Sequence, residues 1–210
     1  MNQIFDFFID AYRGTPTYLI ILEAIAFLFG IMSVYYAKKT NILVYPTGLI
    51  CTVITVYLLY VSEYYGDMMM NFYYSVMSIY GWWNWSRKKD NRLLVPISRT
   101  NIKEKGIGVI LFILTMIITF SVYKAYDYQM EIPNYIDVVT SGIFFTAMWY
   151  MANKKLENWT LWIIADIITI PLYAYRGLGM LSLQYLIFTI LAIQGYIEWK
   201  KSLNKNQQSV

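Results

Sequence analysis

The feature that most constrains this chain is a series of long apolar runs that no charged residue interrupts. Residues 42–61 and 109–123 are two examples. A helix needs about 20 apolar residues to cross a bilayer core, and stretches of that length cover almost the whole chain. Membrane β-strands would instead alternate between apolar and polar residues. The sequence therefore predicts an all-α integral membrane protein surrounded by a lipid bilayer.

We predict seven transmembrane helices that form a single transmembrane domain over residues 1–210. Residues 1–17 contain Asp6 and Asp10 and lack a basic n-region, which does not match a cleaved signal peptide. We therefore expect the first span to remain in the mature protein. The predicted spans are residues 17–37, 42–62, 67–86, 104–124, 135–152, 158–176 and 179–199.

Composition argues against an enzyme. The chain has no histidine and one cysteine, Cys51, so we expect no internal disulfide, no metal site and no catalytic Cys/His pair. No cofactor is expected either. A retinal receptor needs a lysine in mid-membrane for its Schiff base, but the last span contains none before Lys200. A non-transporting structural or receptor protein of the membrane remains an alternative.

Basic residues predict the orientation of the helices. With seven spans, fourteen Lys and Arg residues fall on the face that holds the C-terminus and three on the other face. Cytoplasmic loops carry the excess of Lys and Arg, so we expect a cytoplasmic C-terminus and an outside N-terminus. The same rule explains the positive charge without nucleic-acid binding. The minority set is Arg13, Lys124 and Arg176.

Two pairs of segments suggest an internal repeat. Residues 80–89 resemble residues 194–203 at an offset of 114, and residues 37–50 resemble residues 152–164 at an offset of 117. A loop three residues longer in the first copy would explain the different offsets. The matched residues are Gly81 with Gly195, Trp85 with Trp199, Asn41 with Asn158, and Tyr45 with Trp162.

This repeat predicts a layout of three helices, one linker helix and three helices. The first repeat covers residues 17–89, the linker residues 104–124 and the second repeat residues 135–203. Both copies would enter the membrane in the same direction, so a pseudo-two-fold axis would run along the membrane normal, with a substrate site between the halves. Chance similarity of aromatic-rich helix ends is the alternative.

Two carboxylates fall inside predicted spans, where each costs on the order of 3 kcal/mol. Glu23 has small neighbours that favour close helix contact, so pairing with another helix is one interpretation. Asp166 follows Trp162 by four residues and Asn158 by eight, which places all three on one helix face. A flat aromatic or cationic solute could stack on the indole and be neutralised by the carboxylate. A stripe used only for helix packing is the alternative.

Three further residues are candidates for the same site. Asn71 and Gln184 occupy nearly equivalent repeat positions, ten and eleven residues before the paired glycines. Tyr185 lies beside the second of them.

Several motifs resemble the PnuC-type nicotinamide riboside transporters. They are LEA at residues 22–24, YPTGLI at 45–50, IYGWWNW at 79–85 and the long stretch 156–199 that begins LENWTLW. The resemblance implies a bacterial inner-membrane carrier that works by facilitated diffusion, usually as a homotrimer, while a cytoplasmic vitamin kinase traps the solute by phosphorylation. By motif, the family's binding residues correspond to Cys51, Asn71, Trp162, Asp166 and Gln184.

Four of these five positions depart from the riboside pattern. The resemblance predicts asparagine at Cys51, glutamine at Asn71 and asparagine at Asp166, and some members carry glutamate at Gln184. A carboxylate on span six still suits a flat cation, because a low-dielectric site favours an opposite charge. Nicotinamide riboside is the first candidate, and thiamine, another flat cation, is the second.

Overall fold

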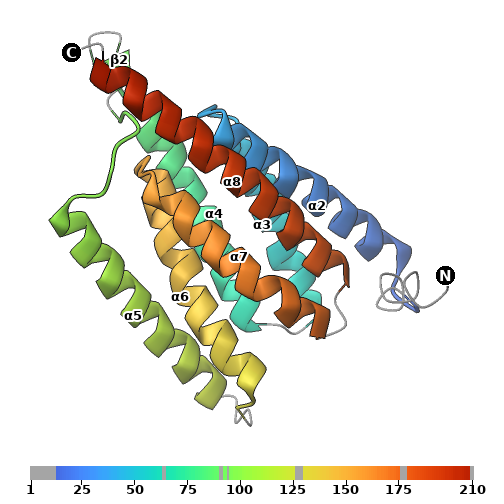
Figure 1. The fold of residues 1–210 in the computed structure, drawn as a ribbon. Coiled ribbons are helices and arrows are strands. Elements are labelled where there is room, and N and C mark those ends of the chain that lie inside the picture. Colours follow the sequence, from blue (N-terminus) through green and yellow to red (C-terminus); the bar gives the residue numbers. More distant parts are fainter. Residues whose placement is uncertain are drawn as a thin grey trace.

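A computed structural model describes residues 13–62, 65–89, 92–93, 95–125, 130–175 and 179–208, which form seven helices and one short β-ladder (Figure 1). The all-α fold is confirmed. The ladder pairs β1 (Lys88–Lys89) with β2 (Arg92–Leu93) in antiparallel fashion between two helices. The helices are α2 (Thr17–Lys38), α3 (Val44–Val61), α4 (Tyr65–Ser86), α5 (Ile102–Ala125), α6 (Ile132–Ala152), α7 (Glu157–Tyr175) and α8 (Gly179–Gln208).

The predicted spans agree with these helices to within three residues, except at the end of α8. This helix continues to Gln208, whereas the last span was predicted to end at residue 199. Residues 200–208 contain no glycine or proline to end it, and Lys205 in the last turn suits the negative end of the helix dipole. The apolar pattern marks where a membrane ends, and not where a helix ends.

Side chains fix the start of α5 and of α6. At α5 the backbone N–H of Glu104 donates to Asn101 Oδ1 at 2.9 Å, and the N–H of Asn101 donates back to Glu104 Oε2 at 2.8 Å. At α6 the residues Glu131 and Asn134 form the same reciprocal capping box. Such boxes satisfy N–H groups that the first helical turn leaves without partners. Both helices therefore begin where the chain turns back toward the membrane.

Four of the described helices are long and apolar enough to cross a membrane by length and composition alone: α2, α3, α5 and Gly179–Lys205 of α8. The others are more polar because neighbouring helices cover them. In α6, eleven residues are buried, including Thr140 and Thr146. Their hydroxyls donate to the helix carbonyls of Ile136 and Gly142 at 3.0 Å. A helix in the middle of the bundle can therefore carry polar residues at a low cost.

The helices form a closed ring with one helix outside it. The order of helices around the ring is α2, α3, α4, α6, α7 and α8, and α8 packs against α2 to close it. The remaining helix, α5, lies against the outer side of α6 (Figure 1). We call α2–α4 the first half and α6–α8 the second half. The halves meet where α2 contacts α8 and where α4 contacts α6. A two-fold axis would exchange these two contacts, although the repeat itself stays a prediction.

Contacts at one end of the bundle occur in matched pairs. This end, where α2, α4 and α6 finish and α8 leaves the bundle, holds Lys38, Lys39, Lys154 and Lys155, and we call it the basic end. The rings of Tyr45 and Trp85 meet edge to face at 5.1 Å, and those of Trp159 and Trp199 at 5.5 Å. The two pairs differ by 114 in both residue numbers, the offset that also relates Gly81 to Gly195.

The contacts of two glycines also bear on the predicted repeat. A Cβ added at Gly81 would lie 2.3 Å from the Tyr45 ring, and one added at Gly195 would lie 2.6 Å from the Trp159 ring. These contacts would pair Tyr45 with Trp159 at the offset of 114, whereas the sequence pairs Tyr45 with Trp162 at the offset of 117. The repeat stays a prediction under either pairing.

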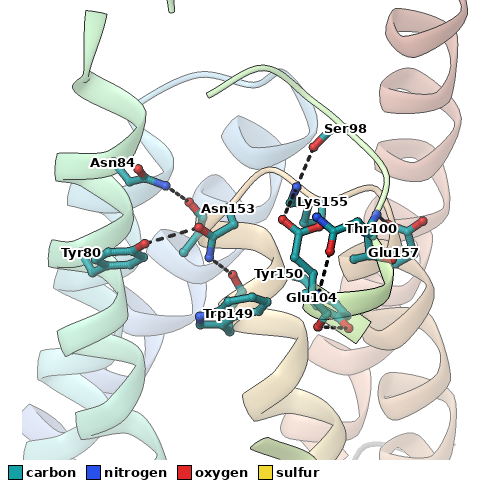
Figure 2. A network of polar contacts seen from close by, with 12 residues as sticks. Tyr80, Asn84, Ser98, Thr100, Glu104, Trp149, Tyr150, Asn153, Lys155 and Glu157 are labelled. Carbon is teal, nitrogen blue, oxygen red and sulfur yellow. Dashed lines mark hydrogen bonds and ion pairs between the residues drawn. The ribbon is translucent and has the colours of Figure 1, made fainter. Parts of the chain in front are cut away.

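Hydrogen bonds and an ion pair connect the segment between α4 and α5 to the second half (Figure 2). Lys155 Nζ donates to Ser98 Oγ at 2.9 Å and forms an ion pair with Glu104 Oε1 at 2.7 Å. The backbone N–H of Thr100 donates to Glu157 Oε2 at 2.9 Å. These contacts join the start of α5 to the turn between α6 and α7. The outer helix is therefore attached to the second half through this connection.

Lys154 in that turn is a buried base. Its side chain lies against the indole of Trp85, with Nζ 4.5 Å from the ring centre, and only 2% of the residue is exposed. Burial lowers the pKa of Lys154 from 10.5 to about 8. The folded protein therefore disfavours the charged form that the unfolded chain prefers, and the free energy of unfolding rises as pH increases from about 8 to 10.5.

Lys154→Met should remove this pH dependence. At pH 7 we expect the free energy of unfolding to rise by up to about 3 kcal/mol, because the variant no longer buries a charge. Thermal unfolding in detergent between pH 7 and 10.5 measures the difference. Lys200→Met, at an exposed position of α8, is the control and should follow the wild type. An unchanged pH slope in Lys154→Met would contradict the assignment.

Candidate substrate site

One face of α7 carries an acidic residue between two aromatic residues. Trp162, Asp166 and Tyr173 lie at positions i, i+4 and i+11 of the helix. At 3.6 residues per turn these positions fall within about 40° of one another. The predicted stripe therefore continues beyond Asp166 to a second ring.

Asp166 lies deep within the protein. Only 1% of the residue is exposed, and its Oδ1 atom has no hydrogen-bond partner in the described part of the chain. The residue 114 positions earlier, Thr52, differs in this respect because the Ser75 hydroxyl lies 2.8 Å from its Oγ1. A buried carboxylate oxygen without a partner is costly unless a proton or a cation neutralises the group. Asp166 is therefore a candidate ligand for a cation.

Aromatic rings from four helices converge beside this face. Phe144 of α6 lies 5.4 Å from Trp162 and 5.9 Å from Tyr185 of α8, measured between ring centroids. Tyr185 also stacks on Tyr173 at 5.3 Å, with the ring planes 8° apart. Two more rings touch the edges of this group, Tyr74 near Trp162 and Phe188 near Tyr185. We call the six residues the aromatic cluster: Tyr74, Phe144, Trp162, Tyr173, Tyr185 and Phe188.

Gly30 of α2 brings the other half to the same place. A Cβ added there would lie 3.1 Å from Gln184 Nε2, 3.3 Å from Cys51 Sγ and 3.3 Å from Phe188 Cζ. Since Phe188 belongs to the aromatic cluster, these contacts connect α2 and α3 with the face that Trp162 and Tyr185 line. The structure thus joins four predicted site residues, Trp162, Tyr185, Gln184 and Cys51, through a continuous chain of contacts.

Asn71 lies on α4 next to this chain of contacts. Its carbonyl accepts a hydrogen bond from Ser75 Oγ at 3.0 Å, and the same hydroxyl reaches Thr52, the neighbour of Cys51. Tyr74, three residues after Asn71, belongs to the aromatic cluster. The predicted position is therefore close to the site, on the helix that contributes Tyr74.

Asn158 lies at the basic end of the predicted stripe, and its place in the site stays a prediction. It is fully buried at the start of α7, and its Nδ2 donates to the carbonyl of Lys155 in the preceding turn. It shares a helix face with Trp162 and Asp166, but its amide stabilises the basic end. The structure supplies no contact, among the residues it describes, that links this amide to the aromatic cluster.

Comparison with known proteins gives the family. The family model for "Nicotinamide mononucleotide transporter" matches residues 20–201, a range that includes nearly all seven helices. The chain belongs to this family. The similarity extends over 86% of the chain to the nicotinamide riboside transporter PnuC of Escherichia coli K12, which is 24% identical and 85% covered.

Two other similarities add detail. The crystal structure of the vitamin B3 transporter PnuC shares the fold, with a TM-score of 0.70 and 24% identity over 88% of this chain and 82% of that one. The riboflavin/roseoflavin transporter RibM of Streptomyces davaonensis is 25% identical over 59% of this chain and 58% of its own length. The chain is therefore a multi-pass membrane transporter and not an enzyme, as its composition predicted.

The sequence of this family member did not reveal two residues of the site, Phe144 and Gly30. The ring of Phe144 lies between those of Trp162 and Tyr185, and Gly30 leaves room for Gln184, Cys51 and Phe188. Both roles depend on contacts between helices, which no local sequence pattern shows.

The side chains assigned to the site suit binding of a solute. No cluster of His, Cys, Asp and Glu that could hold a metal ion occurs in the described residues. The functional groups are one carboxylate, two amides, a thiol and several rings. Such a set can surround a flat solute and neutralise one positive charge.

Proposed function

We propose that this protein carries nicotinamide riboside across the membrane. The observation that carries the proposal is Asp166, a buried carboxylate with an unpartnered oxygen, placed between Trp162 and Tyr173 on one helix face. Nicotinamide riboside has a flat pyridinium ring with a permanent positive charge. Its ring suits stacking on aromatic side chains, and its charge suits the carboxylate. The PnuC relative of Escherichia coli is a nicotinamide riboside transporter, which supports the same choice.

The polar residues nearby suit the rest of such a molecule. Gln184 and Asn71 provide amides that can donate to or accept from ribose hydroxyls, and both side chains are half-buried. No Lys or Arg occurs in α7 or in α8 before Lys200. We therefore propose the riboside and not a phosphorylated nucleotide, because the phosphate would lack a basic partner.

We infer that transport is facilitated diffusion into a bacterial cell across its inner membrane, with the basic end in the cytoplasm. Fourteen of seventeen Lys and Arg residues support this orientation. Phosphorylation by a cytoplasmic kinase would then keep the free vitamin low inside and maintain inward flux. A homotrimer is part of the proposal by family resemblance.

Thiamine is the second candidate. It is also a flat cation, and the replacement of expected residues at Cys51, Asn71 and Asp166 favours a site that differs from the riboside pattern. Both cations need the carboxylate, so the residues described above support either. A competition measurement, in which each compound displaces the other from the protein, decides between nicotinamide riboside and thiamine.

A panel of four vitamins tests the proposal. Thermal unfolding of the purified protein is measured in the presence of nicotinamide riboside, nicotinamide, thiamine or riboflavin. Uptake of the same four compounds is measured in proteoliposomes that contain the protein. We expect nicotinamide riboside to raise the unfolding free energy by about 2.7 kcal/mol at 100 times its Kd. Uptake should stop when inside and outside concentrations are equal. A larger stabilisation and faster uptake with thiamine would identify thiamine as the substrate. If none of the four compounds binds or is taken up, the proposed solute class is wrong.

A further inference from the structure

Most of the described hydrogen bonds and ion pairs between the two halves lie at the basic end, and the bond from Tyr73 to the carbonyl of Phe145 lies outside it. On one side of the ring, Asn84 of α4 donates to the carbonyl of Ala152, the last residue of α6, at 3.0 Å (Figure 2). On the other side, Lys38 of α2 donates to Gln194 Oε1 of α8 at 2.7 Å, and Lys39 pairs with Glu198 at 3.2 Å. The structure therefore holds the halves together at the end rich in Lys and Arg.

Two buried tryptophans make the matching contacts at the centre of this end. Trp85 Nε1 of the first half donates to the carbonyl of Ala152 at 3.2 Å, and Trp199 Nε1 of the second half donates to the carbonyl of Ala37 at 3.1 Å. Each indole N–H therefore binds the final turn of a helix in the other half. Trp85 is 3% exposed and Trp199 is 1% exposed.

The two indoles also contact each other across the boundary between the halves. Their ring centroids are 6.0 Å apart, and Tyr45 and Trp159 pack edge to face against their outer sides. These four rings form one contiguous group at the basic end, with two rings from each half. We expect a solute that leaves the aromatic cluster in this direction to meet this group.

We propose that Trp85 and Trp199 are the residues that control opening of the basic end: their reciprocal hydrogen bonds must break before the solute can leave. This proposal rests on the proposed function for the direction of transport. Each bond joins a buried indole N–H of one half to a carbonyl at a helix C-terminus of the other half. The two carbonyls also have other donors, since Ala37 O accepts the N–H of Thr40 at 3.0 Å and Ala152 O accepts Asn84 Nδ2. The indole N–H groups have these partners only while the halves are together. Each bond therefore favours the closed state over the open one.

We expect a shift between a closed and an open state and not a loss of the site. Rocking of one half against the other is a common route of alternating access in carriers built from two similar halves. Removing one buried hydrogen bond that exists only in the closed state should increase the open fraction by about three- to tenfold. The residues that we assign to the vitamin site remain unchanged.

Cys51 provides a natural probe for the experiment, because it is the only cysteine in the chain and lies in the candidate site. Inverted membrane vesicles expose the basic end to a membrane-impermeant maleimide. We compare the labelling rate of the full-length wild type with that of Trp85→Phe and Trp199→Phe, each of which keeps a ring but removes the N–H. Each variant should label about three- to tenfold faster, and the double variant faster still.

Two control variants distinguish opening of the basic end from a general loss of packing in the protein. Trp83→Phe changes an exposed tryptophan on the same helix and should leave the labelling rate unchanged. Cys51→Ser should abolish labelling. Equal rates in the wild type and both single variants would overturn the proposal, and so would an equal increase in Trp83→Phe.

A second variant covers the case in which a buried Trp→Phe protein does not fold. Glu198→Gln removes the charge that faces Lys38 and Lys39 across the boundary, at a surface position that tolerates change. It should increase the labelling rate about twofold, in keeping with the small energy of an exposed ion pair. An unchanged or slower rate would count against the proposal. Labelling needs no vitamin, so failure of the substrate panel and failure of this proposal give different results.

Discussion

Asp166→Asn is expected to reduce the affinity for a cationic vitamin at least about 100-fold, while most of the protein still folds. The change keeps the shape of the side chain but removes its charge, and loss of one partner from a buried charge pair costs about 3 to 5 kcal/mol. Folding should be preserved because the buried carboxylate has an oxygen without a partner in the described part of the chain. Isothermal titration with nicotinamide riboside and with thiamine measures the effect.

A matched control for this variant is Asp137→Asn. Asp137 lies in the first turns of α6, where its carboxylate accepts a hydrogen bond from Tyr123 of α5. Affinity should stay within about threefold of the wild type. If Asp166→Asn binds the vitamin as tightly as the wild type, a protonated aspartic acid that only packs between helices explains the residue, and the proposed role is wrong.

Gly195→Ala is expected to lower stability strongly although alanine favours helices. The added Cβ would lie 2.6 Å from the indole of Trp159, which is buried and cannot move aside cheaply. Overpacking costs about 1 to 3 kcal/mol, and this exceeds the gain in helix propensity of about 0.5 to 1 kcal/mol. We expect the unfolding temperature in detergent to fall by about 5 °C.

The comparison that makes this result interpretable is Gly106→Ala in α5. No heavy atom lies within 4 Å of a Cβ added at Gly106, so helix propensity alone should act and the unfolding temperature should rise slightly. Gly81→Ala should resemble Gly195→Ala, because its Cβ would meet the ring of Tyr45 at 2.3 Å. A rise in all three variants would show that the contacts between glycines and rings are loose.

Much of the fold was predictable from the sequence because lipid imposes a simple rule. A helix that crosses a bilayer must be apolar over about 20 residues, so runs such as residues 109–123 locate α5 directly. The more polar α6 and α7 were also predicted, from their length and flanking charges. The end of α8 was not, since a helix that leaves the membrane no longer needs apolar residues.

The site was only partly predictable. Trp162 and Asp166 could be recognised because they lie one turn apart on one helix, and helical periodicity is visible in a sequence. Phe144 and Gly30 could not, because their importance depends on contacts with other helices.

The sequence by itself determined that this chain spans a membrane, where its helices lie and which of them carries a buried charge. These properties depend on residues near one another along the chain and on the solvent around them. Only the tertiary structure decided that Cys51 and Gln184 meet at Gly30 and that Trp85 and Trp199 fasten the two halves. Those contacts join helices distant in sequence, and they depend on how side chains of different sizes pack around the ring of helices.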